Sequence, residues 1–161
     1  MHRIAKVCLA LATATPLLAQ APAVHGITCD AGEGQRIHIH QRLTILKRGT
    51  PVPVPAQIGI PLMTPCIYWL HTHTPDGFIH VEAPLDRSFT LGDFFAIWGR
   101  PLDKTHAVEG LAPGDSMRVW VDGKIFRGDP ATIPLKAHTD ITIQLGPPFT
   151  KPALFTNWGK L

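Results

Sequence analysis

Prolines and glycines divide this chain into short segments and so limit the folds it can adopt. The 161 residues include 16 prolines and 14 glycines, spread along most of the length. Proline interrupts helix interiors and inner strands, and glycine favours turns. Short strands joined by turns fit this distribution better than long helices do. We therefore expect a mostly β fold, a small β-sandwich or open barrel with one short helix.

A two-residue alternation of apolar and polar side chains predicts where the strands lie. The segment RIHIHQRLTIL (36–46) is the longest example, and PVPVPAQIGI (51–60) predicts an edge strand or an extended loop because proline cannot donate to a ladder. Asp122-Gly123 predicts a tight hairpin turn. Further strands are expected in CIYWLHTH (66–73), GFIHVEA (77–83), SMRVWVDGKIFRG (116–128) and TDITIQLG (139–146). The tail from residue 147 shows no period.

One segment has the period and the end signals of a helix. In FTLGDFFAIWG (89–99), Thr90 is a suitable N-cap and Gly99 a suitable stop. The apolar side chains that such a helix would bury are Phe94, Phe95, Ile97 and Trp98.

The N-terminal stretch predicts export. A basic MHRIAK is followed by the apolar VCLALATATPLLA (7–19) and by small residues that include the pair Ala21 and Ala23. This order is typical of a signal peptide, and the apolar run is too short for the alternative, an uncleaved membrane anchor. We expect a signal peptide over residues 1–23, a single domain over 24–161, and a periplasmic or secreted protein with no membrane span.

Cys29 and Cys66 remain once a signal peptide carrying Cys8 is removed. An even pair in an oxidising compartment predicts a disulfide, and the alternative of two thiolate metal ligands lacks the close Cys-x-x-Cys spacing. The formal net charge of +3 would fall to about +1 with the loss of Arg3 and Lys6. No basic run then remains, so nucleic acid and anionic membranes are poor partners. A protein partner stays open.

Histidines recur at the strand period in three of the predicted strands. Residues two apart on a strand point to the same side, so each H-x-H presents two imidazoles together. A metal ion needs several such donors converging at about 2 Å from one point. The candidate metal ligands are His38, His40, His71, His73, His80 and Glu82. The alternative is a set of solvated polar side chains on an exposed face.

The turn TPDG (74–77) decides whether these residues converge. A three-residue loop would pair Thr72 with His80 and put His71 and His73 on the opposite face. An even loop pairs His73 with His80 and His71 with Glu82. We favour the even loop because it gathers the apolar and neutral side chains on the other face, namely Leu70, Thr72, Ile79 and Val81.

CIYWLHTHTPDGFIHVEAP followed by FTLGDFFAIWG resembles a family of secreted bacterial and archaeal proteins. Its members show an H-I-H-x-H-L strand, then C-L-Y-W-L-H-T-H-D and G-x-I-H-V-E. The similarity covers about residues 29–99 and identifies relatives without implying an activity. Arg42 and Thr74 stand where the family pattern has His and an acid, so no ligand is expected there.

Donors of this kind suit a transition metal ion, with copper favoured by the Irving–Williams order and zinc or iron possible. The first hypothesis is therefore an exported metal-binding protein for storage, delivery or tolerance. The second is a metalloenzyme with an open coordination position, with Glu82 as a general base and a pocket lined by Tyr68, Trp69 and Phe78. The third is a structural β domain that binds no metal. The chain contains no G-x-S-x-G motif and no glycine-rich phosphate loop.

Overall fold

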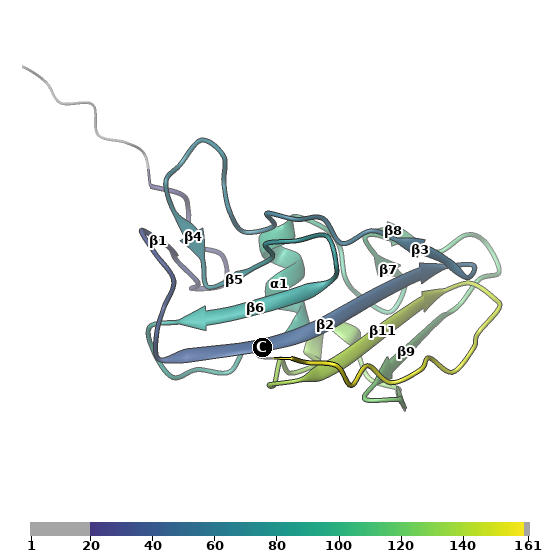
Figure 1. Ribbon diagram of the computed structural model, residues 1–161. Coiled ribbons are helices and arrows are strands. Elements are labelled where there is room, and N and C mark those ends of the chain that lie inside the picture. The colour runs from purple at the N-terminus through teal and green to yellow at the C-terminus, as the bar shows by residue number, and fades with distance from the viewer. Residues whose placement is uncertain (1–19, 160–161) are drawn as a thin grey trace, which may run out of the picture.

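The computed structural model describes residues 20–159, and its main feature is one twisted sheet (Figure 1). The sheet has seven strands in the order β10-β9-β11-β2-β6-β5, with β3 also paired to β2. These strands are β2 (Ile37–Lys47), β3 (Thr50–Val52), β5 (Leu70–His71), β6 (Phe78–Ala83), β9 (Met117–Val121), β10 (Lys124–Phe126) and β11 (Thr139–Leu145). Two small two-stranded sheets join β1 (Cys29–Asp30) to β4 (Ile67–Tyr68) and β7 (His106–Ala107) to β8 (Glu109–Gly110). The prediction of a mostly β fold with one short helix is confirmed.

The long strand β2 organises the sheet because its two halves have different neighbours. Its first half pairs antiparallel with β6, from Ile37 opposite Ala83 to Arg42 opposite Phe78. From Gln41 onward it pairs in parallel with β11, and its end also pairs with β3. The site-bearing half of β2 is therefore held by β6, while its second half is anchored in the rest of the sheet.

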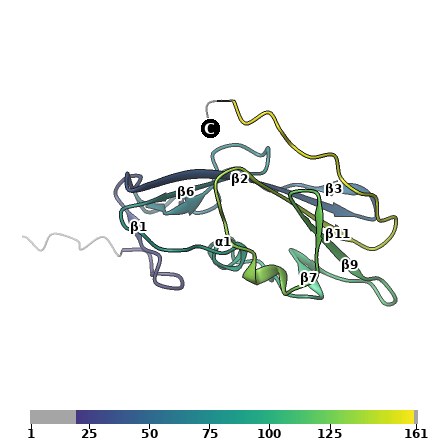
Figure 2. The same cartoon turned by 90° about the horizontal axis from the view of Figure 1, so that it is seen from below.

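Helix α1 (Leu91–Trp98) and the short 3₁₀ helix η1 (Pro130–Thr132) lie against one face of the sheet (Figure 2). Thr90 caps α1 through a reciprocal capping box with Asp93, and Gly99 ends it in the left-handed conformation. Phe94 and Phe95 are buried as expected, whereas Ile97 and Trp98 are only partly buried. The covered face of the sheet thus forms the apolar core.

The opposite face of the sheet carries the polar side chains of β2 and β6, and the C-terminal segment runs over part of it (Figure 2). This segment has no helix or strand within the described residues, in line with its lack of period. It is nevertheless packed: the rings of Phe155 and Trp158 contact Phe78, and the Arg42 guanidinium lies over Phe155. The remainder of this face is where the histidines lie.

The predicted hairpin turn and the predicted proline-rich edge segment are both present. Asp122 and Gly123 have positive φ and join β9 to β10 in a two-residue loop, with Lys124 opposite Val121. The PVPVP segment supplies the short edge strand β3 and then continues as a loop. An edge strand has one side without a ladder partner, so the missing N–H of proline costs no hydrogen bond inside the sheet.

The predicted Cys29–Cys66 disulfide is confirmed, with a Cα–Cα distance of 5.3 Å. It lies beside the β1–β4 pair, in which Cys29 is opposite Tyr68. The bridge therefore ties the segment that leads into β2 to the segment that leads into β5. The predicted signal peptide falls mostly on residues 1–19, outside the described part of the chain. Among residues 20–159, no helix is long and apolar enough to cross a membrane.

The predicted pairing between β5 and β6 is correct in face but wrong by two residues in register. His71 lies opposite His80, and Leu70 opposite Val81, rather than His73 opposite His80. A shift of two residues keeps every side chain on its predicted face. The cause lies outside the hairpin: after His71 the chain leaves β6, and Thr72 bonds instead to the backbone at Gln57 and Ile58.

Candidate metal centre

Three neighbouring strands bring the histidines to one face of the sheet. His40 on β2 and His71 on β5 both lie opposite His80 on the central strand β6, so the three form a row across the strands. His38 lies opposite Glu82, two residues away on each of the same two strands, so this pair points to the same face. On the other face, Leu70, Thr72, Ile79 and Val81 are fully buried, as the binary pattern predicts. Burial of the apolar face thus fixes which way the histidines point.

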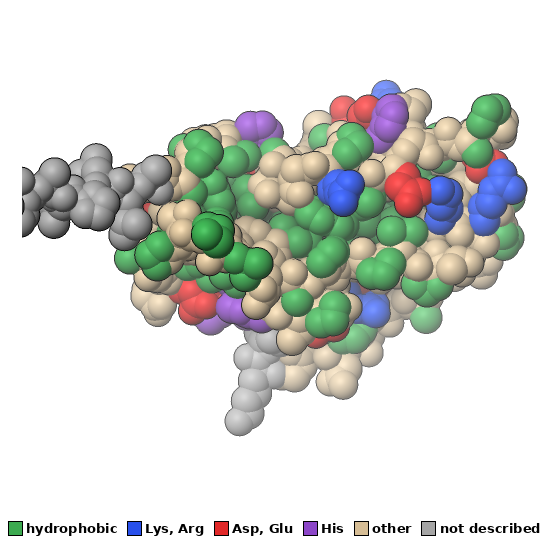
Figure 3. Space-filling model, turned by 90° about the horizontal axis from the view of Figure 1, so that it is seen from above, with side chains coloured by type: hydrophobic (Ala, Val, Ile, Leu, Met, Phe, Trp, Pro, Cys, Tyr) green, Lys and Arg blue, Asp and Glu red, His purple; other side chains and the backbone are tan. Residues whose placement is uncertain are grey.

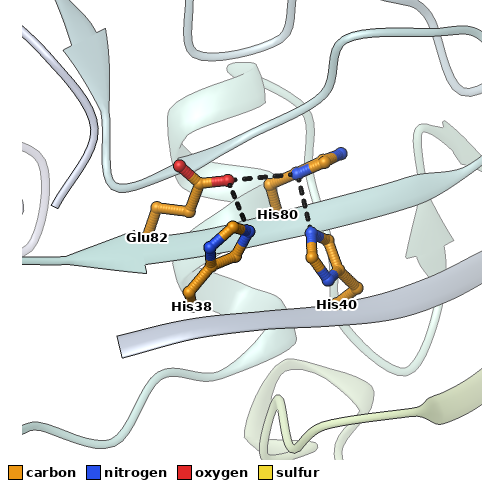
Figure 4. Close-up of side chains that lie close together, drawn as sticks. All are labelled: His38, His40, His80 and Glu82. Atoms are coloured by element: carbon orange, nitrogen blue, oxygen red, sulfur yellow. Dashed lines mark hydrogen bonds and ion pairs between the residues drawn. The ribbon is translucent and has the colours of Figure 1, made fainter. Parts of the chain in front are cut away.

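The first group of donors lies between β2 and β6 (Figure 4). His40 Nε2 is 3.0 Å from His80 Nδ1, and His80 Nδ1 is 3.2 Å from Glu82 Oε1. His38 Nε2 is 3.2 Å from the same carboxylate oxygen. The predicted convergence of the first histidine pair with His80 and Glu82 is therefore present.

The second group of donors lies on the β5 side of β6. His71 Nε2 is 3.2 Å from His73 Nε2, and Glu82 Oε1 is 4.0 Å from His71 Nε2. The His80 ring stacks on that of His71, with 5.2 Å between centroids. The ligand atoms of His71, His73, His80 and Glu82 all lie within 4.8 Å of one another, as do those of His38, His40, His80 and Glu82. All six predicted residues are thus brought together.

The His71 side chain is held in one orientation by its surroundings. It is fully buried, and its Nδ1–H donates to the backbone carbonyl of Tyr68 at 3.0 Å. The loop through Gly59 packs directly against Leu70 and His71. The approach is so close that a Cβ at Gly59 would lie 2.4 Å from the Leu70 carbonyl oxygen. An Nδ1–H bonded to a carbonyl leaves Nε2 with its lone pair, and this is the state in which histidine binds metals.

Glu33 is a site residue that sequence reasoning missed. Its Oε1 lies 3.4 Å from His73 Nε2 and 3.9 Å from His71 Nε2. Glu33 comes from the loop between β1 and β2, where Gly34 donates its N–H to the Glu82 carbonyl. A Cβ at Gly34 would lie 2.2 Å from the Ala83 backbone, so only glycine lets the loop approach β6 this closely. The flanking glycines in AGEGQ are the one signal that could have pointed to Glu33.

Burial shifts the protonation of the cluster toward the neutral state. Burial, followed by the neighbouring histidines, lowers the pKa of His80 to about 3, and burial lowers the pKa of His71 to about 4. Burial also lowers the pKa of His40. For Glu82, burial and then the Glu33 carboxyl raise the pKa to about 7. Neutral imidazoles with free lone pairs are what a metal ion requires.

The spacing of the donors fits a transition metal ion. Two ligands that each lie 2.0–2.1 Å from a tetrahedral ion are about 3.3 Å apart. The observed separations between neighbouring donors are 3.0 Å for His40 and His80, and 3.2 Å for His71 and His73. Imidazole nitrogen with carboxylate oxygen suits copper, zinc or iron, so the residues present fit the predicted metal.

Other residues considered from the sequence lie outside this cluster. Arg42 contacts Phe155 and Asp140, and Thr74 is exposed in the turn. His106 pairs with Asp103, and His138 is exposed with its ring stacked on Trp158. None of these four residues belongs to the two donor groups.

The three aromatic side chains expected to line a substrate pocket have other contacts. Tyr68 donates its hydroxyl to the Pro22 carbonyl, and Trp69 donates its Nε1–H to Asp30. Phe78 packs against the C-terminal segment. Their side chains thus contribute to packing in separate places.

Histidine and acidic side chains meet at the molecular surface on the lower margin of Figure 3. The side chains of His38, His73 and Glu33 are 55%, 43% and 42% exposed, whereas Glu82 is 4% exposed. Solvent therefore reaches one side of the cluster while its base is buried.

Comparison of the chain with protein-family models, with curated proteins and with solved structures found no match. The functional conclusion therefore depends on the geometry of the site.

Proposed function

We propose that this protein is an exported binding protein for a transition metal ion, serving storage, delivery or tolerance. The observation that carries the proposal is the meeting of five imidazoles and two carboxylates on one face of the sheet. Their nearest donor atoms are 3.0–4.0 Å apart. A cation placed among them would be held by several lone pairs at once, which is what a metal site requires.

The orientation of His71 supports a ligand role over a purely structural one. A structural histidine commonly satisfies both ring nitrogens with protein groups. Here Nδ1–H is satisfied by the Tyr68 carbonyl, while Nε2 faces His73, Glu33 and Glu82. This is the arrangement of a metal-bound histidine whose second nitrogen is fixed by a carbonyl.

Copper is the favoured ion and zinc the next. The donors are imidazoles and carboxylates, and divalent copper binds such sets most tightly among the first-row ions. Within residues 20–159 both cysteines are joined in the Cys29–Cys66 disulfide, so this part of the chain offers no thiol to favour Cu(I). The disulfide also supports an oxidising location after export, as does the resemblance to secreted proteins.

A metalloenzyme is the second candidate. The exposure of His38 and His73 favours it, since an open side of the metal could accept water or a small substrate. The lack of a shared role for Tyr68, Trp69 and Phe78 near the cluster removes the pocket expected for such a substrate. Binding without catalysis is therefore the function that the geometry supports best.

The proposal is tested by stripping the purified protein with a chelator, reloading it with Cu(II) or Zn(II), and measuring retained metal after gel filtration. We expect stable retention by the wild-type chain and a loss of at least about tenfold in affinity in the double variant His38→Ala/His73→Ala. A matched control is His25→Ala/His106→Ala, which also removes two partly exposed histidines, 60% and 45% exposed, but from outside the cluster. Failure of the wild-type protein to retain either ion would leave the structural β domain as the correct hypothesis.

A further inference from the structure

We infer that the site holds two metal ions bridged by Glu82, and this inference rests on the proposed metal-binding function. One ion would lie between β2 and β6, with His38, His40 and His80 as ligands. The other would lie on the β5 side, with His71, His73 and Glu33 as ligands.

The first support is that the donors form two groups rather than one. His38 and His40 share a group with His80 and Glu82, and His71 and His73 share a separate group with the same two residues. Ligands on opposite sides of one ion are at most about 4.2 Å apart, twice the metal–ligand distance. A single ion would therefore use one group and leave the other histidine pair without a cation.

The second support is the number of donors. Five histidines and two glutamates meet here, whereas one ion of this kind takes about four to six ligands. With Glu82 shared, two ions would have four protein ligands each. The donors are Glu33, His38, His40, His71, His73, His80 and Glu82.

The third support is the separate placement of Glu33. Its Oε1 forms a triangle with His71 Nε2 and His73 Nε2, with sides of 3.2, 3.4 and 3.9 Å. No strand pairing requires Glu33 to be there; the close approach of Gly34 to the Ala83 backbone puts it there. The β5 side therefore has a carboxylate of its own in addition to the shared Glu82.

Glu82 is the natural bridge because the same carboxylate oxygen faces histidines of both sets. Its Oε1 faces His38 and His80 at 3.2 Å and His71 at 4.0 Å, so the group lies between the two sets of histidines. In Figure 4 the other oxygen points away from His38 and His80. Paired metal ions in proteins are commonly about 3.5–4 Å apart, a separation that a bridging carboxylate can span.

The number of ions is measured by titrating the chelator-stripped, full-length protein with Cu(II) and counting bound ions by native mass spectrometry and elemental analysis. We expect two ions per chain in the wild type. Electron paramagnetic resonance should show less than the full isolated-copper signal, because two Cu(II) ions this close couple magnetically.

Variants then separate the two positions. Glu33→Ala/His73→Ala should reduce the count from two to one and restore an isolated Cu(II) signal, and His38→Ala should remove the other ion. His106→Ala serves as the control and should keep both. Saturation of the wild-type protein at one ion would overturn the bridged pair while leaving the proposed function standing. Retention of no ion would overturn both.

Discussion

The two H-x-H pairs have the same local sequence pattern but different supports. His38 and His40 lie on a long regular strand, paired with β6 along its whole first half. His71 ends the two-residue strand β5, and His73 already lies in the connection to β6. The first pair is positioned mainly by the regular ladder between β2 and β6. The second depends on the Tyr68 carbonyl, the Gly59 loop and the disulfide.

The burial of a histidine motif on a strand depends on the elements beside it. In each pair one histidine is buried and one is exposed: His40 with His38, and His71 with His73. Alternation explains why the members of a pair share a face. It does not explain the difference in burial, which comes from the neighbouring segments.

The largest effect is expected from removing the disulfide. Cys29→Ser/Cys66→Ser should lower the free energy of unfolding by about 3–4 kcal/mol, from the loop-entropy estimate for this span. Because the bridge holds the segments before Glu33 and β5, metal binding by His71 and His73 should weaken more than binding by His38 and His40. Chelation should therefore lower the melting temperature less in a reduced sample than in an oxidised one, because weaker metal binding contributes less stability, as measured by calorimetry. Equal shifts in the two samples would show that the bridge does not support the second pair.

The next effect is on metal affinity. Glu82→Gln keeps the shape of the side chain but removes the charge that both pairs share. Affinity for Cu(II) should fall by at least about 100-fold, because loss of a charged ligand costs no less than loss of a residue that merely supports one. Competition with a chelator of known affinity gives the measurement, with His38→Ala as the comparison that affects one pair only. Unchanged affinity in Glu82→Gln would contradict a shared carboxylate.

The metal-free protein should distinguish the two pairs by stability. His71→Ala removes a buried side chain and leaves the Tyr68 carbonyl without its partner, so it should destabilise by about 2–3 kcal/mol. His38→Ala, at a half-exposed position, should stay within about 0.5 kcal/mol of the wild type. Urea unfolding in excess chelator measures both. Equal losses of unfolding free energy in the two variants would mean that the groups around His71 do not hold its ring in place.

The last effect is a dependence of the stability of the metal-free protein on pH. His71 and His80 have folded pKa values of about 4 and about 3, below the ordinary 6.5, so the stability they contribute above pH 6.5 is lost as the pH falls toward 3. Glu82 acts in the opposite sense: its folded pKa of about 7 means that its contribution is present below pH 4.5 and lost as the pH rises through 7.

As the pH falls from 7 to 4.5, the loss of stability from His71 and His80 is therefore opposed by the gain from Glu82. Glu82→Gln removes the carboxylate trend, so its unfolding free energy should fall more steeply than that of the wild type as the pH is lowered through this range. Urea titrations at several pH values in chelator provide the test. Parallel pH profiles would contradict a raised pKa for Glu82.

Much of the fold follows from local patterns. The strand at 37–47, the capped helix at 91–98 and the Asp122-Gly123 turn each depend on contacts between near neighbours, which the sequence displays directly. The parallel pairing of β2 with β11 joins segments about 100 residues apart, and no local pattern specifies it. The predicted register of β5 was wrong because Thr72 bonds to a loop that the hairpin alone does not contain.

For the site, alternation along the strands specifies which residues share a face, because burying Leu70, Ile79 and Val81 forces His71, His80 and Glu82 to the other side. Which of these residues are in contact depends on the tertiary structure. The two-residue register, the approach of Gly34 to β6 and the arrival of Glu33 all depend on backbone segments distant in sequence. The two-residue alternation along a strand specifies the face to which each side chain points. The distances between side chains depend on the segments that pack beside them.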